Sequence, residues 1–140
     1  MLVETSEYPE DGSMMSTTRS IGVVVVDDQE PYRAVLRLAV EMMDGFEPVG
    51  EADSGEAGID LVDELRPDLV LMDVKMPGID GLEATRRIVS MWPDTVVVVL
   101  STYHADEFEA LALDAGAAAF ISKADFGSDT LATIARIWHP

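Results

Sequence analysis

Residues 69–84, LVLMDVKMPGIDGLEA, hold the change of pattern that decides the fold. An apolar run ends abruptly at the carboxylate of Asp73, and a turn-forming stretch with Pro77 and Gly78 follows. Beyond the turn, the spacing of apolar residues predicts a helix over 81–92. A strand that passes through a short loop into a helix is the repeating unit of α/β proteins.

Similar apolar runs recur along the chain, and helical patterns separate them. Three of the runs are apolar without alternation, as expected for strands covered on both faces. The predicted strands are 21–26, 47–52, 68–73, 95–100 and 118–122, and the predicted helices are 32–43, 54–65, 81–92, 105–116 and 128–138. This order predicts an α/β, doubly wound (βα)5 flavodoxin-like fold, a three-layer sandwich around a parallel sheet of strand order 2-1-3-4-5.

Polar and small residues mark the ends of the predicted helices. Ser54 is a suitable N-cap for the second helix, and Pro67 stops it. Gly116 is a typical residue for the end of the fourth helix. The first helix carries apolar residues on one side, namely Val35, Leu36, Leu38, Ala39 and Met42.

The totals exclude several classes of protein. The net charge is −18, from 27 acids against 9 bases, and such a surface repels nucleic acid phosphates. The absence of cysteine excludes disulfides and thiolate metal sites. No apolar run approaches the roughly 20 residues that span a membrane. We therefore expect a cytoplasmic protein that binds neither nucleic acid nor membrane directly.

The chain divides into two parts by composition. Residues 1–19 contain Ser, Thr, Glu, Pro and Gly with few large apolar groups, and they predict a disordered N-terminal extension. Residues 20–140 have the length of one compact domain, which holds all of the predicted elements.

Acidic residues end two of the predicted strands. Asp27 and Asp28 follow the first strand and Asp73 ends the third, and the carboxyl ends of these strands meet where the strand order reverses. Converging carboxylates repel one another unless one is protonated or a cation binds. Oxygen ligands of high charge density suit Mg²⁺. The alternative is that Asp27 and Asp28 merely cap the helix that follows them.

The ends of the fourth and fifth strands add a hydroxyl and an ammonium group. Ser101 follows the fourth strand, and Ser122 and Lys123 end the fifth. Carboxylates, a metal ion, a hydroxyl and an ammonium around one acid make a site for a phosphoryl group. In this interpretation Asp73 is the nucleophile, while Lys123 and Mg²⁺ neutralise the phosphoryl oxygens.

These residues resemble the receiver domain of bacterial two-component response regulators. The resemblance covers residues 21–138 and rests on VVVVDDQE, DLVLMDVKMPGIDGLEATRRI, VVVVLST and GAAAFISKAD. It implies that Asp73 accepts a phosphoryl group from the phosphohistidine of a sensor histidine kinase or a phosphotransfer protein. The SKAD form at 122–125 is similar to receivers that carry a LuxR-type helix-turn-helix output domain.

The same resemblance implies roles for the residues around Asp73. Mg²⁺ is expected on Asp28, Asp73 and the main-chain carbonyl of Lys75, with Asp27 acting through water. Ser101 and Phe120 stand at the switch positions that reshape the surface of the fourth helix, fifth strand and fifth helix. The resemblance also places Lys123 at the family's lysine position, and Lys75 and Tyr103 where the lifetime of the phosphoryl group is tuned. Many receivers have proline after the lysine, but this chain has Ala124, so a cis peptide bond is not expected.

Other functions of the same fold remain as alternatives. A pseudo-receiver acts as an unphosphorylated interaction module. A Mg²⁺-dependent phosphatase of the haloacid dehalogenase type needs an acid two residues after the nucleophile, where this chain has Lys75. A flavin module needs a phosphate-binding loop after the first strand, where Asp27 and Asp28 repel phosphate. We therefore expect a signalling domain that is catalytic only in its own phosphotransfer and dephosphorylation. Homodimerisation, and the choice between a free-standing receiver and a transcription regulator with an output domain, stay open.

Overall fold

A computed structural model describes residues 20–102, 106–127, 130 and 134 of the chain. Within these ranges it contains five β-strands, four α-helices and one 3-10 turn. The strands are β1 (Ile21–Val26), β2 (Phe46–Ala52), β3 (Leu69–Asp73), β4 (Val96–Ser101) and β5 (Ala119–Ser122). The helices are α1 (Glu30–Glu41), α2 (Gly55–Leu65), α3 (Gly81–Met91) and α4 (Asp106–Asp114), and the 3-10 turn η1 spans Lys123–Asp125.

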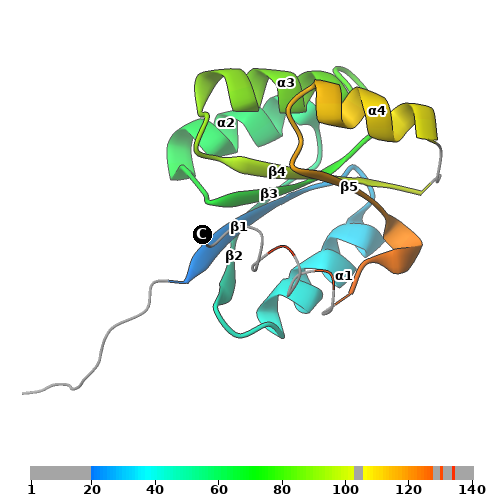
Figure 1. The fold of residues 1–140 in the computed structure, drawn as a ribbon. Coiled ribbons are helices and arrows are strands. Elements are labelled where there is room, and N and C mark those ends of the chain that lie inside the picture. Colours follow the sequence, from blue (N-terminus) through cyan, green and yellow to red (C-terminus); the bar gives the residue numbers. More distant parts are fainter. Residues whose placement is uncertain (1–19, 103–105, 128–129, 131–133, 135–140) are drawn as a thin grey trace, which may run out of the picture.

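All five strands form one parallel sheet in the order β2-β1-β3-β4-β5. Helices α2, α3 and α4 cover one face of the sheet, and α1 covers the other (Figure 1). The predicted fold class and strand order are thereby confirmed. The predicted fifth helix lies mostly outside the described residues, although Thr130 and Ile134 are helical. The predicted extension of residues 1–19 also lies outside them.

The core consists of two apolar layers, one on each face of the sheet. Along β3, Val70 and Met72 point to the layer under α2 and α3, whereas Leu69 and Leu71 point to the layer under α1. Successive side chains of a strand alternate between faces, so a strand covered on both sides needs an uninterrupted apolar run. Every residue of β3 is buried. This rigid central strand ends at Asp73.

The helix ends follow the signals in the sequence. The Oγ of Ser54 accepts a hydrogen bond from the main-chain N–H of Ala57 at 3.0 Å, which confirms the predicted N-cap of α2. Gly116 has a φ of +107° just beyond α4, a conformation that glycine adopts without strain. Helix α1 begins earlier than predicted, at Glu30, because Pro31 is well suited to a first helical turn.

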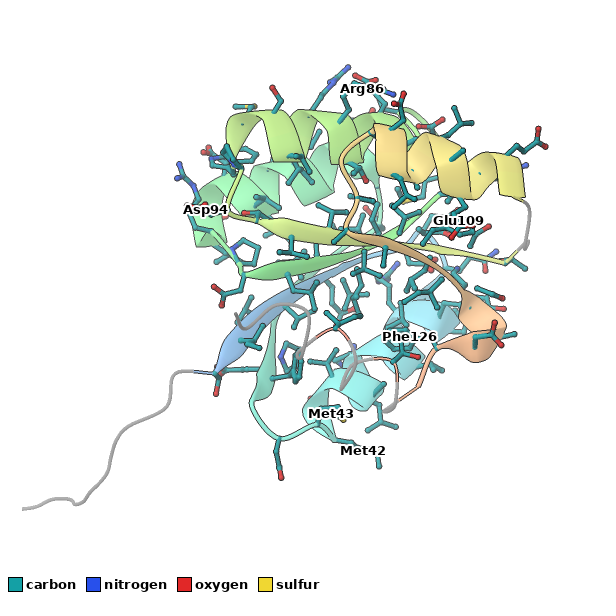
Figure 2. All side chains as sticks on the ribbon, viewed as in Figure 1. Met42, Met43, Arg86, Asp94, Glu109 and Phe126 are labelled. Atoms are coloured by element: carbon teal, nitrogen blue, oxygen red, sulfur yellow. The ribbon has the colours of Figure 1, made fainter. Side chains whose placement is uncertain are left out.

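The predicted apolar side of α1 was wrong in part. Leu36 and Val40, one turn apart, are buried against the sheet. Val35, Leu38 and Met42 are 61%, 55% and 75% exposed, and Met42 is labelled in Figure 2. Only the stripe of α1 at spacing i, i+4 faces the sheet, so the flanking apolar residues project away from it. In the described part of the chain, no helix is long and apolar enough to cross a membrane.

Candidate functional site

Three carboxylates meet where the order of the strands reverses. Asp27 and Asp28 follow β1, and Asp73 is the last residue of β3, its neighbour in the sheet. One oxygen from each carboxylate lies within 4.8 Å of the other two. Asp27 and Asp73 are buried, whereas Asp28 is exposed. The predicted convergence of these acids is therefore confirmed.

Asp27 is held by hydrogen bonds on both of its carboxylate oxygens. Its Oδ1 accepts from the main-chain N–H of Gln29 at 2.9 Å, and its Oδ2 accepts from Lys123 at 2.6 Å. Its main-chain carbonyl accepts a hydrogen bond from Arg33 at 2.7 Å. The N-cap of α1 is Gln29 rather than either aspartate. Asp27 thus helps to shape the start of α1 while it binds the lysine, so helix capping alone does not explain the acids.

Lys123 begins the turn that follows β5 and reaches across to the acids. Its Nζ lies 2.6 Å from Asp27 Oδ2 and 3.3 Å from Asp73 Oδ1, and its side chain is only 6% exposed. Burial alone would lower the pKa of Lys123, but its hydrogen bond to Asp27 and the charges of Asp73 and Asp27 outweigh burial and raise the pKa. The lysine therefore stays an ammonium and neutralises part of the cluster.

Lys123 does not fully offset the effects of burial and of the neighbouring acids on the pKa of Asp73. Burial, together with repulsion from Asp27 and more weakly from Asp28, raises the pKa of Asp73 to about 6, although Lys123 opposes the rise. The ammonium of Lys123 contacts two of the three clustered acids, Asp27 and Asp73. A hard divalent cation with oxygen ligands, such as Mg²⁺, fits this donor set. Such a cation would also favour the ionised form of Asp73.

The loop after Asp73 is fixed from the inside. Val74 and Met76 are buried, and the main-chain N–H of Val74 donates to the carbonyl of Leu100 at 3.2 Å. A Cβ on Gly81 would lie 1.8 Å from the carbonyl oxygen of Asp73. Only glycine allows α3 to begin this close to the end of β3.

The outer side of the same loop is fastened by α2. Glu56 Oε2 accepts a hydrogen bond from the main-chain N–H of Ile79 at 3.3 Å. Gly78, with a φ of +84°, lies beside this carboxylate. Asp80 then caps α3 by accepting from the main-chain N–H of Glu83 at 2.9 Å. The loop that is expected to supply the Lys75 carbonyl is thus held at both ends.

The acids open into a cleft of about 310 Å³. Its lining residues are Asp28, Gln29, Tyr32, Asp73, Lys75, Ser101, Thr102 and Lys123. Ser101, the last residue of β4, pairs with Ser122 of β5 and is buried beside this cleft. The sequence-predicted acids, lysines and hydroxyl are therefore brought together at one place.

Phe120, a predicted switch residue, does not line the cleft. Phe120 pairs with Val99 along β4 and β5 and packs, partly buried, against the core under α2, α3 and α4. Its position next to α4 agrees with a switch role, which stays a prediction. Tyr103, predicted to tune the phosphoryl lifetime, lies outside the described residues.

Sequence reasoning missed Tyr32. Its ring covers the Lys123 ammonium, with 3.9 Å between Nζ and the ring centroid. The available signal was its place four residues after Asp28, in the first turn of α1, because helical side chains point back toward the N-terminus of their helix. The contact itself requires a residue from the opposite end of the chain, which no local pattern reveals.

Comparison with known proteins finds similarity to response regulators and their receiver domain. The family model for the response regulator receiver domain matches residues 23–136. The response regulator GacA of Pseudomonas viridiflava is 47% identical over 103 residues, covering 74% of this chain and 48% of that protein. The chain thus spans about half the length of the curated relatives it matches.

Solved structures of response regulators share the fold of this chain and part of its sequence. The signal receiver domain of the putative response regulator NarL from Mycobacterium tuberculosis superposes with a TM-score of 0.80 at 29% identity, covering 86% of this chain and 97% of that one. A LuxR-family two-component response regulator from Aurantimonas sp. SI85-9A1 gives a TM-score of 0.79 at 28% identity, with 85% of each chain covered.

Proposed function

This chain belongs to the family of response regulator receiver domains, and from that premise we propose that Asp73 is its phosphoacceptor. Receiver domains are signalling domains that act through phosphorylation. The donor is the phosphohistidine of a sensor histidine kinase or of a phosphotransfer protein. The observation that carries the proposal is the buried Asp73 carboxylate, which clusters with Asp27 and Asp28 at the edge of a cleft and lies 3.3 Å from Lys123.

The reaction is a transfer of one phosphoryl group between two side chains. An oxygen of Asp73 attacks phosphorus, the new O–P bond forms, and the P–N bond to the donor histidine breaks. The leaving imidazole nitrogen keeps the electron pair and takes a proton. Burial on the rigid end of β3 holds the nucleophile in place, and the open cleft admits the donor.

The neighbouring groups stabilise charge on the phosphoryl oxygens. Lys123 supplies an ammonium, and Ser101 supplies a hydroxyl from the end of β4. Asp28, Asp73 and the carbonyl of Lys75 would hold Mg²⁺ directly, with Asp27 acting through water, and the ion would neutralise phosphoryl charge. Lys75 and Tyr103 tune how long the phosphoryl group survives.

Phosphorylation then changes a surface remote from Asp73. Ser101 moves toward the phosphoryl group and Phe120 turns inward, which alters the surface of α4, β5 and the predicted fifth helix. The neighbouring placement of β4, β5 and α4 supports this proposal (Figure 1). A LuxR-type output domain, or a second copy of this chain, would respond to the altered surface. The site acts catalytically only in its own phosphotransfer and dephosphorylation, and we place it in the cytoplasm.

Incubation with acetyl phosphate and Mg²⁺, followed by intact mass spectrometry, tests the proposal. We expect the wild type to gain one phosphoryl group and Asp73→Asn to gain none. Asp68→Asn, just before the start of β3, is the matched control and should be phosphorylated like the wild type. A wild type that stays unmodified, and whose spectra do not respond to beryllofluoride with Mg²⁺, would instead identify a pseudo-receiver.

A further inference from the structure

The ammonium of Lys123 contacts three groups in the cleft. Its Nζ lies 2.6 Å from Asp27 Oδ2, 3.3 Å from Asp73 Oδ1 and 3.9 Å from the centroid of the Tyr32 ring. An ammonium group has three N–H donors and carries its charge on a flexible stem. Two carboxylates attract it, and the aromatic ring covers it from a further side. The side chain is 6% exposed, so water has little access to it.

The start of α1, which carries Tyr32, is tied to Asp27, the acid that also binds the lysine. Asp27 accepts a hydrogen bond from the main-chain N–H of Gln29, and the carbonyl of Asp27 accepts one from Arg33. The main-chain N–H of Tyr32 in turn donates to the carbonyl of Gln29 at 3.1 Å. Tyr32 is 37% exposed as a residue, lines the cleft and covers the buried lysine ammonium with its ring. Its position over Lys123 is therefore held by the site itself.

The chain provides an internal comparison, because Lys75 and Lys123 are its only two lysines. Both line the cleft, and each lies near an aromatic ring. The Nζ of Lys75 is 5.7 Å from the ring centroid of Phe108, and Lys75 is exposed. Cation–π attraction strengthens when the cation approaches the ring and loses water. Of these two contacts, the one between Tyr32 and Lys123 is the closer and the drier.

We propose that Tyr32 is a positioning residue for phosphotransfer, whose ring holds the Lys123 ammonium beside Asp73 and keeps water from it. Without the ring, water would compete for the ammonium, and its stem would be free to turn toward solvent or toward Asp27 alone. The lysine would then stabilise an incoming phosphoryl group less well. The effect on rate rests on the proposed function, whereas the placement of the ammonium does not.

Tyr32→Leu removes the ring, and Tyr32→Phe keeps it without the hydroxyl. With acetyl phosphate and Mg²⁺, we expect Tyr32→Leu to be phosphorylated about five- to thirtyfold more slowly than the wild type, the range for losing one desolvated cation–π contact. We expect Tyr32→Phe to recover most of the rate. Tyr32→Met is a second ringless variant in case leucine perturbs α1, and thermal unfolding reports the folding of all three.

NMR of lysine-labelled protein without phosphodonor tests the contact directly, since two lysines give two sets of side-chain signals. We expect the ε-methylene signals of Lys123 to lie upfield in the wild type and in Tyr32→Phe, because the ring shields them. They should move downfield in Tyr32→Leu, while those of Lys75 stay in place. Unchanged Lys123 signals, or equal or faster phosphorylation of folded Tyr32→Leu and Tyr32→Met, would overturn the proposal. Absence of phosphorylation in the wild type, with the NMR shifts as expected, would reject the proposed function and leave the contact standing.

Discussion

Asp68 lies just before β3 and Asp73 is its last residue, and the two aspartates serve different purposes. Asp68 precedes β3, and its Oδ2 accepts a hydrogen bond from the main-chain N–H of Gly22 at 2.9 Å, which fastens β1 to β3. Asp73 ends β3 and faces two further acids and a lysine. Both residues are aspartates beside the same apolar run. The end of the strand decides the role, because the carboxyl ends converge where the strand order reverses.

Replacing Lys123 should have the largest effect at the Asp73 end. We expect Lys123→Met to slow phosphorylation by acetyl phosphate about 100- to 1,000-fold, as when a preorganised charge-stabilising group is lost. It also leaves Asp27 buried beside Asp73 without its ammonium, so the free energy of unfolding should fall by about 3–5 kcal/mol. Kinetics by mass spectrometry and urea unfolding measure the two effects.

Lys75→Met is the control for this experiment, because it removes the other lysine of the same cleft. Its side chain is exposed, so the stability of this variant should stay close to that of the wild type. An equal loss of rate in both variants would mean that general positive charge, and not the placement of Lys123, supports the reaction.

Gly81 tests how tightly the Asp73 end is packed. In Gly81→Ala the new Cβ would lie 1.8 Å from the carbonyl oxygen of Asp73, so α3 or β3 must shift. We expect the free energy of unfolding to fall by about 3 kcal/mol, at the upper end of the cost of overpacking. Gly127→Ala is the control, since a Cβ there would meet nothing within 4 Å. If both variants unfold at the same urea concentration, the close approach of α3 is not a constraint.

The raised pKa of Asp73 predicts a pH dependence of stability without divalent ions. The ordinary pKa is 3.8 and the folded value is about 6, so between these values the folded protein binds more protons than the unfolded chain. The contribution of Asp73 to the free energy of unfolding is fully present below pH 3.8 and is lost as the pH rises through about 6. The total loss is roughly 3 kcal/mol at most.

Urea unfolding of the wild type and of Asp73→Asn, in the presence of a chelator, tests this dependence. The quantity to follow from pH 4 to pH 7 is the difference in the free energy of unfolding between the two proteins. The wild type should lose stability relative to the variant as pH rises. Adding Mg²⁺ at pH 7 should stabilise the wild type more than the variant, because binding to the folded state adds to its stability. A constant difference across pH would show that Asp73 titrates normally.

The smallest effect is expected at the Asp68 end. Asp68→Ala removes the acceptor for the Gly22 N–H, which should cost about 1 kcal/mol, whereas Asp68→Asn keeps an acceptor oxygen and should cost less. Neither variant should change the rate of phosphorylation. If Asp68→Asn abolished phosphorylation, as Asp73→Asn is expected to, the distinction between Asp68 and Asp73 would be wrong.

The sequence by itself determined the order of elements and the meeting of Asp27, Asp28 and Asp73. Uninterrupted apolar runs indicate strands covered on both faces, and alternation with helices leaves few topologies for a parallel sheet. Since that topology fixes which strand ends are neighbours, the acids and the approach of Lys123 could be predicted without coordinates. Helix caps such as Ser54 depend on adjacent residues, so they could be predicted as well.

Only the tertiary structure decided which side of α1 is buried, how far the pKa of Asp73 rises, and that Tyr32 covers Lys123. The pattern of α1 shows several apolar residues, but the packing of the helix on the sheet selects Leu36 and Val40. The pKa depends on burial and on distances to charges that follow β1 and β5. The contact between Tyr32 and Lys123 joins residues near the two ends of the domain. Such properties arise from distances across the fold, and the spacing of residues along the chain does not contain them.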